Sequence, residues 1–123
     1  HSFVNTLCKK IPNFEDIIVY GNGMQTRDYV YVTDVVNALL LGINNTGLYN
    51  VGTGQDYAVV KLIDTIHEIT RCKPNIKFTP PQKNEIARSR ADIAKITELR
   101  WEPTMTLEEG LKAVLEASGW KRM

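Results

Sequence analysis

The chain has 123 residues, of which 43% are hydrophobic and 24% are charged, and both fractions are close to those of soluble globular proteins. A chain of this length buries roughly two thirds of the surface that it exposes when unfolded, so we expect one domain over residues 1–123. The formal net charge of +1 excludes the broad basic surface that a nucleic-acid-binding protein needs. Any site for an anion must therefore be local.

Membrane and metal-binding classes are also disfavoured. The longest apolar run, residues 38–41, is far shorter than the roughly 20 residues that span a membrane, and no signal peptide is visible, which predicts a cytoplasmic protein. Cys8 and Cys72 stand outside any spacing typical of metal ligands, which predicts two reduced, packing thiols and no metal site. Because the chain begins at His1 without an initiator methionine and its first residues already fall in a helical pattern, we expect the start of the chain to be a cut in a longer protein.

The first third of the chain predicts a helix, a strand and a second strand followed by a helix. Residues 2–10 repeat apolar side chains on one helical face, and the short β-branched run 17–20 enters a glycine turn. Residues 29–32 form a second β-rich run. Thr33 and Asp34 then supply a cap and a first-turn acid for a helix to about residue 43.

The rest of the chain continues this alternation. We expect a short strand at 48–51, a helix at about 59–71 without a side-chain cap at Ala58, a strand at 76–78 and a polar loop to residue 91. This loop is a natural place for ligand contacts. Asp92 should cap a short helix to about residue 99, and Thr106 with Glu109 forms a capping box for a last helix to about residue 117. The pattern predicts an α/β layer that packs on something else.

Two apparent motifs do not indicate catalysis. Tyr57 and Lys61 have the Y-x-x-x-K spacing of short-chain dehydrogenases, but Tyr57 precedes the predicted helix, so the two side chains do not share a helix face. Residues 21–23 and 52–54 each read G-x-G without the third glycine of a dinucleotide-binding fingerprint, and both are better explained as turns.

Arg27 is the best candidate ligand. It lies in the polar segment 24–28 between two β-rich runs, where a planar guanidinium can bind a phosphate with two parallel hydrogen bonds. The alternative is a surface ion pair between Arg27 and Asp28 or Glu85. Composition and spacing leave both possibilities open.

Five segments together resemble one known family. They read VYGNGMQTRDYVYVTDVVNA at 19–38, YNVGTG at 49–54, ADIAK at 91–95, LRWEP at 99–103 and TLEEGL at 106–111. In order and spacing they resemble the C-terminal, substrate-binding region of the extended short-chain dehydrogenase/reductase (SDR) family, the NAD-dependent epimerases and dehydratases. Within it they are nearest to the UDP-glucose/UDP-galactose 4-epimerase branch, and the resemblance covers nearly all of the chain.

The resemblance implies a small α/β C-terminal domain with short strands and several helices, without the Rossmann domain. It implies that this part binds a UDP-sugar. The missing N-terminal Rossmann domain would bind NAD, carry the catalytic residues, and remove and return the hydride, so this segment alone should be inactive. The alternatives are that the chain is part of a nucleotide-sugar dehydratase or reductase, or that it is a stand-alone non-catalytic binding module. The face meant for the Rossmann domain would be exposed, so we also expect an oligomer.

The resemblance also implies roles for individual residues. Arg27 stands where the family binds the diphosphate, and Ile18 and Tyr20 stand where it contacts uracil. The family's later P-R-x-G-D/E motif reads PQKNE here, so Gln82 replaces an arginine and Glu85 keeps the acid that binds the ribose. Gln82 still forms hydrogen bonds but lacks the charge, and Lys83, Arg88 or Arg90 could substitute as a point charge.

Overall fold

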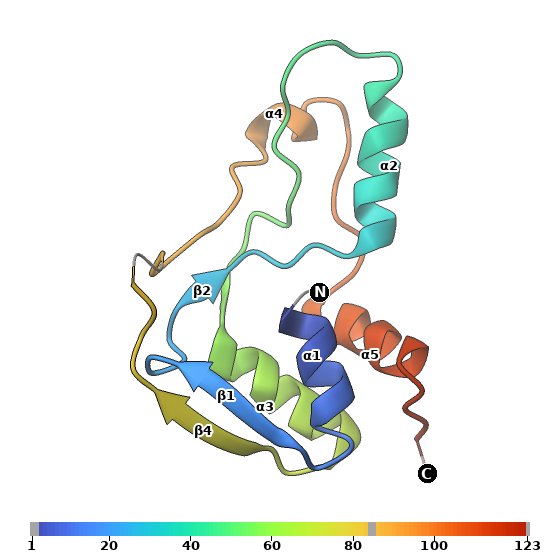
Figure 1. Ribbon diagram of the computed structural model, residues 1–123. Helices are drawn as coiled ribbons and strands as arrows, with labels where there is room; N and C mark the ends of the chain where they lie inside the picture. The colour runs from blue at the N-terminus through green and yellow to red at the C-terminus, as the bar shows by residue number, and fades with distance from the viewer. Residues whose placement is uncertain (1–2, 84–85, 123) are drawn as a thin grey trace.

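The computed structural model describes residues 3–83 and 86–122. Their helices and strands follow in the order α1 Phe3–Lys10, β1 Asp16–Tyr20, β2 Thr26–Arg27, α2 Val32–Gly42, β3 Tyr57–Ala58, α3 Val59–Thr70, β4 Asn75–Thr79, α4 Ala94–Thr97 and α5 Leu107–Ala117. The fold is mixed α/β with short strands, as the sequence predicted (Figure 1). Within the described residues, no helix is long and apolar enough to cross a membrane.

The larger core lies where β1, α1, α3 and α5 meet. Strands β1 and β4 pair in parallel with Ile18 opposite Lys77, and α3 lies behind this sheet (Figure 1). Alternate residues of β1 point inward, so Ile17 and Val19 are buried while Ile18 and Tyr20 are exposed on the other face. Leucine and isoleucine side chains from the three helices complete this core, namely Leu7, Leu62, Ile63, Ile66, Leu111 and Leu115.

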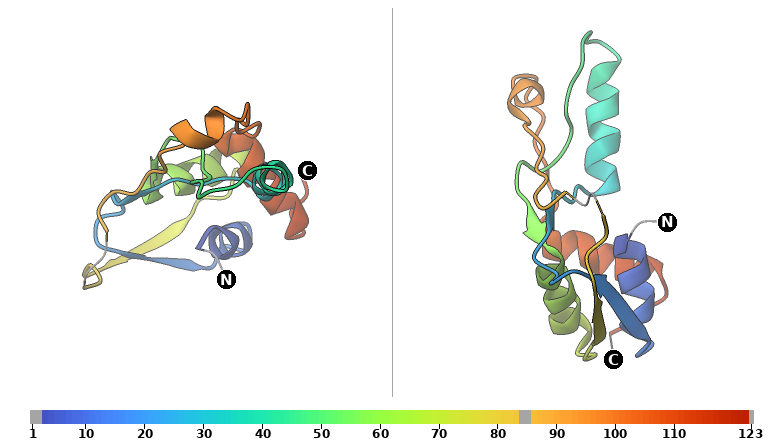
Figure 2. Two further views of the ribbon diagram at one scale, coloured as in Figure 1. Left: turned by 90° about the horizontal axis from the view of Figure 1, so that it is seen from above. Right: turned by 60° about the vertical axis from the view of Figure 1, so that its left-hand side comes forward.

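A smaller core lies in the upper part of the molecule, where α2 stands apart from the other long helices (Figure 2). Ala38 on α2, Ile96 on α4 and Trp101 pack together there. The other side of α2 has no covering element among the described residues, and Leu39 and Ile43 are 68% and 75% exposed. The fold therefore presents an apolar helix face to its surroundings.

Two predicted strands are wrong, for one physical reason. Residues 29–31 form no strand, and Tyr31 is extended just before α2; neither they nor residues 48–51 pair with a strand in the described part of the chain. A strand needs a hydrogen-bonded neighbour, which sequence patterns do not supply. The pairing that forms instead joins β2 to β3, antiparallel, through two residues on each side.

Helix ends were predicted with mixed success. The capping box is confirmed, since the Glu109 amide donates to Thr106 Oγ1 and the Thr106 amide donates to Glu109. Helix α3 begins without a side-chain cap at Ala58, also as predicted. Thr33 does not cap α2, and α4 is shorter than predicted, although the Ala94 amide does donate to Asp92 over 3.1 Å.

Candidate functional site

A cavity of about 460 Å³ lies between α1 and β1 and reaches the start of the 80–91 loop. Ile18, Tyr20, Arg27 and Gln82 all line it, so four of the predicted site residues come together at one place. Glu85, the fifth, lies outside the described residues. Among the described lining residues, two are cations, Arg27 and Lys10, and none is an acid. This charge pattern favours an anionic ligand.

Ile18 and Tyr20 owe their place in the cavity to strand alternation. Their neighbours Ile17 and Val19 are 2% exposed and fix the strand to the core, which leaves Ile18 and Tyr20 47% and 43% exposed on the opposite face. A flat apolar group can therefore stack on this part of the wall.

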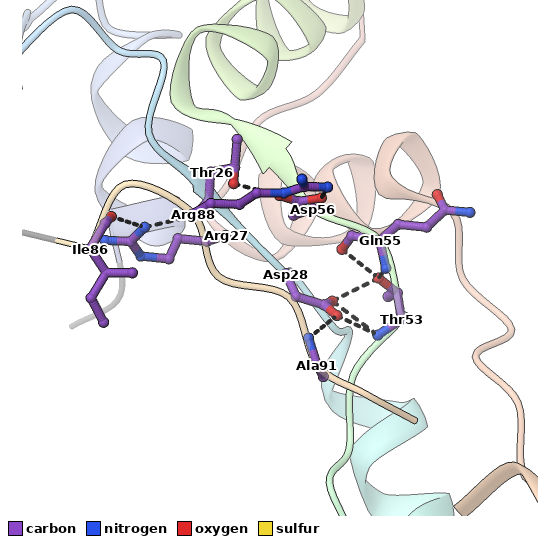
Figure 3. A network of polar contacts seen from close by, with 9 residues as sticks. All are labelled: Thr26, Arg27, Asp28, Thr53, Gln55, Asp56, Ile86, Arg88 and Ala91. Atoms are coloured by element: carbon purple, nitrogen blue, oxygen red, sulfur yellow. Dashed lines mark hydrogen bonds and ion pairs between the residues drawn. The ribbon is translucent and has the colours of Figure 1, made fainter. Parts of the chain in front are cut away.

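The Arg27 side chain is held from two directions. Its Nη1 atom donates to the carbonyl oxygens of Thr26 and Ile86, each over 2.6 Å (Figure 3). The guanidinium is thereby tied to the loop that follows β4. The alternative pair with Asp28 does not account for its position, because Asp28 takes its hydrogen bonds from other residues. The alternative pair with Glu85 lies outside the described residues.

Asp28 organises the glycine turn instead. Its carboxylate accepts hydrogen bonds from the Thr53 amide at 2.9 Å, the Thr53 hydroxyl at 2.7 Å, the Gly54 amide at 3.0 Å and the Ala91 amide at 3.2 Å (Figure 3). A Cβ atom on Gly52 would lie 2.6 Å from Ala91 Cβ and 2.8 Å from Asp28 Oδ2, so only glycine fits. The amides of this turn therefore bind Asp28 and not a phosphate.

The loop after β4 is fastened to β2. The Thr26 amide donates to the Ala87 carbonyl at 2.9 Å, and the Ser89 amide donates to the Thr26 carbonyl at 3.1 Å. Arg88 forms an ion pair with Asp56 at 2.7 Å, and the Asp56 carboxylate also accepts the Thr26 hydroxyl. Arg88 is thus engaged away from the cavity, and neither Lys83 nor Arg90 lines it. Within the described residues, none of these three cations lines the cavity.

The contacts that Asp56 makes with Arg88 and Thr26 stabilise the fold over a defined pH range. The hydrogen bonds from Arg88 and Thr26 lower the pKa of Asp56 to about 2. An ordinary carboxyl has a pKa near 3.9, so the ionised form stabilises the fold above about pH 4 and this contribution is lost as the pH falls towards 2. We expect the difference in urea midpoint between the wild type and Asp56→Asn to be constant above about pH 5 and to close below 4.

The matched control for this pH dependence is Asp64→Asn, which changes an exposed carboxyl on α3. It should leave the urea midpoint near that of the wild type across the range. A difference for Asp56→Asn that stayed the same at pH 2 would contradict the assigned pKa.

The remaining candidate groups have structural roles. Tyr57 lies in β3 before α3 begins and donates its hydroxyl to Gln55 at 2.8 Å, so it does not share a helix face with Lys61. Cys8 is buried, and burial raises the pKa of its thiol to about 12, which makes it unreactive. Cys72 is also a free thiol.

Lys10 is a charged lining residue that was not among the predicted site residues. Lys10, the last residue of α1, reaches the cavity together with Phe3 and Thr6 from the same helix. The i, i+3, i+7 spacing of these three residues was the available signal, but a lysine at a helix end is usually a solvated residue.

The fold is that of the SDR-type epimerases. The structure superimposes on the crystal structure of UDP-glucose 4-epimerase from Thermotoga maritima with a TM-score of 0.89 and 36% identity, covering 94% of this chain and 38% of that one. Residues 3–114 match the family model described as GDP-mannose 4,6 dehydratase. The chain belongs to that family, part of the extended SDR class that its motifs resemble.

The relatives of this chain are named for more than one enzymatic activity. The chain is 34% identical over 102 residues to UDP-glucose 4-epimerase of Mycolicibacterium smegmatis, covering 80% of this chain and 33% of the relative. It is 34% identical over 105 residues to UDP-glucuronic acid decarboxylase 1 of Danio rerio, covering 83% of this chain and 25% of the relative. The chain thus spans a quarter to a third of the length of these proteins.

Proposed function

We propose that this chain is the nucleotide-sugar-binding, C-terminal region of an NAD-dependent UDP-sugar 4-epimerase. The observation that carries the proposal is the single cavity that joins Ile18, Tyr20, Arg27 and Gln82 and has no described acid in its wall. Its volume of about 460 Å³ is within the range of small-molecule sites. A largely apolar wall with a few polar groups is what a base with a diphosphate requires.

Each residue takes the role that its chemistry allows. Ile18 and Tyr20 stack against the uracil. Arg27 binds the diphosphate, and its hydrogen bonds to the Thr26 and Ile86 carbonyl groups orient the guanidinium for this contact. Gln82 contributes a neutral hydrogen bond to the same group. Glu85 binds the ribose. Arg27 then carries most of the charge-assisted binding, because a neutral amide stands where the family has a second arginine.

The cofactor belongs to a different part of the protein. The described glycine turns do not fit the pyrophosphate of a dinucleotide, because the Thr53 and Gly54 amides bind Asp28 and the Gly21 amide donates to the Thr79 carbonyl at 2.8 Å. An upstream Rossmann domain supplies the NAD site and the hydride chemistry. This segment alone binds the substrate and does not convert it.

The upstream domain covers the exposed face of α2. This face carries Leu39 and Ile43 beside an apolar hollow of about 500 Å³ that Leu48 also lines. Residues 48–51 lie next to this hollow, and they pair with no strand among the described residues. A patch of this kind favours association, and the missing two thirds to three quarters of the relatives' length provides the partner. Without that domain, the chain should self-associate.

A sugar-nucleotide decarboxylase is the second candidate, because relatives named UDP-glucuronic acid decarboxylase match at similar identity. Both activities start from a UDP-sugar, and the residues described above bind the part that the substrates share. The nucleotide site therefore supports the substrate class, and the choice between reactions depends on the upstream domain.

Calorimetry and a product assay test the proposal. Titration of UDP and of UDP-glucose into the chain should give saturable binding at one site without conversion. The full-length protein should form UDP-galactose from UDP-glucose, whereas release of CO₂ from UDP-glucuronate would favour the decarboxylase. The proposed substrate class would be rejected if the full-length protein bound no uridine nucleotide.

A further inference from the structure

Helix α1 has two functional stripes. Leu7 and Cys8 face the core and are at most 1% exposed. Phe3, Thr6 and Lys10 lie on the neighbouring stripe and form the wall of the cavity that faces β1. This wall contains an aromatic ring, a hydroxyl and an ammonium group, so it offers hydrogen bonds as well as apolar contact.

Lys10 precedes β1 in the chain, Arg27 follows it, and both line the cavity. Helix α1 ends at Lys10, close to the start of β1, where the Glu15 amide donates to the Lys10 carbonyl at 3.0 Å (Figure 1). Arg27 follows the other end of β1, after the glycine turn. A strand rises about 3.3 Å per residue, so the two ends of β1 are roughly 13 Å apart. A nucleotide that lies along β1 with its diphosphate at Arg27 therefore points its base towards Lys10.

Asp16, a carboxyl that feels the charge of Lys10, already has other partners. Asp16 forms an ion pair with Lys77 at 2.8 Å and accepts a hydrogen bond from Asn75. Lys77 has the larger effect in lowering the pKa of Asp16, and Lys10 adds a smaller one. Lys10 is half-buried at the cavity wall, whereas its neighbour Lys9 is exposed and does not line the cavity. The two lysines share the end of a helix but differ in access to the ligand.

We propose that Lys10 is the base-recognition residue of this site and selects uridine nucleotides over cytidine nucleotides. The inference rests on the proposed function, since it uses the orientation of the diphosphate at Arg27. An ammonium group only donates hydrogen bonds. The C4 keto oxygen of uracil accepts one, whereas the C4 amino group of cytosine is itself a donor, so an ammonium group that faces the C4 substituent loses its acceptor. Selection of the base therefore follows from donor and acceptor pairing.

Titration calorimetry with UDP and CDP, on the full-length protein, tests this assignment. The wild type should bind UDP about tenfold or more tightly than CDP, in line with the strength of one charge-assisted hydrogen bond. Lys10→Met should weaken UDP binding by about the same factor, with little effect on CDP, so that the preference collapses. Lys10→Gln should also lose most of the preference. Lys9→Met is the matched control and should behave as the wild type.

Each outcome has one meaning. Equal weakening of UDP and CDP by Lys10→Met would show general attraction to the diphosphate and overturn base recognition, as would an unchanged preference for UDP. Circular dichroism melting of both Lys10 variants should match the wild type. If the variants were partly unfolded and the loss of UDP preference followed the unfolded fraction, the assignment would also be overturned. Failure of the wild type to bind either nucleotide would instead reject the proposed function.

Discussion

Replacement of Asp34 with alanine should destabilise the protein more than any other single change described here. Asp34 is 1% exposed, and its carboxylate accepts the Thr104 amide at 3.1 Å, the Thr104 hydroxyl at 2.6 Å and the Met105 amide at 3.2 Å. Burial alone would raise the pKa of Asp34, but these hydrogen bonds leave it lowered, so the carboxylate is ionised at neutral pH. The alanine variant leaves the Thr104 and Met105 donors unsatisfied and should lose about 3 kcal/mol of unfolding free energy in urea titrations.

Two further variants test whether the effect comes from this hydrogen-bond network or from the removal of a carboxyl group in general. Asp34→Asn keeps the shape of the side chain and one acceptor oxygen. Its unfolding free energy should therefore lie between those of the wild type and the alanine variant. Asp64→Ala removes an exposed carboxyl from α3 and should change the unfolding free energy by no more than about 0.5 kcal/mol. A urea midpoint for Asp34→Ala equal to that of the wild type would contradict a stabilising role for the network.

Replacement of Arg27 with glutamine should have the largest effect on ligand binding. Charge-assisted hydrogen bonds contribute about 1.5–3 kcal/mol each, so losing the guanidinium should raise the dissociation constant for UDP by about tenfold to a hundredfold. Uridine lacks the diphosphate, and its weaker binding should change little. In the full-length protein the NAD content should stay the same, because the cofactor is bound by the upstream domain. Calorimetry with both ligands measures the difference.

Arg27 also holds the loop at Ile86, so a second variant must separate binding from loop position. Arg88→Gln breaks the ion pair with Asp56 that fastens the same loop, but Arg88 does not line the cavity. We expect this variant to bind UDP within a few-fold of the wild type. If both variants weakened UDP and uridine equally, Arg27 would act through the loop and not through the diphosphate.

The candidate site illustrates how far local patterns reach. The motif around Arg27 pointed to a diphosphate contact, and the structure puts the residue in the same cavity as Ile18, Tyr20 and Gln82. Lys10 was not among the predicted site residues, because nothing in its immediate sequence relates it to a cavity formed with β1. Asp28 appeared as a possible ion-pair partner, whereas it binds the turn at residues 53–54 and the Ala91 amide. Such contacts join segments far apart in the chain.

Sequence patterns predicted the features that depend on neighbours within a few residues. These are the amphipathic helices α1, α3 and α5, the capping box at Thr106, the alternating strand β1 and the motifs of the family. Which of the β-rich segments became strands depended on tertiary packing, because a strand at 48–51 requires a pairing partner that the described chain does not provide. Packing likewise brings Asp34 to residues 104 and 105 and brings Lys10 and Arg27 to one cavity, since these contacts arise only when distant segments meet.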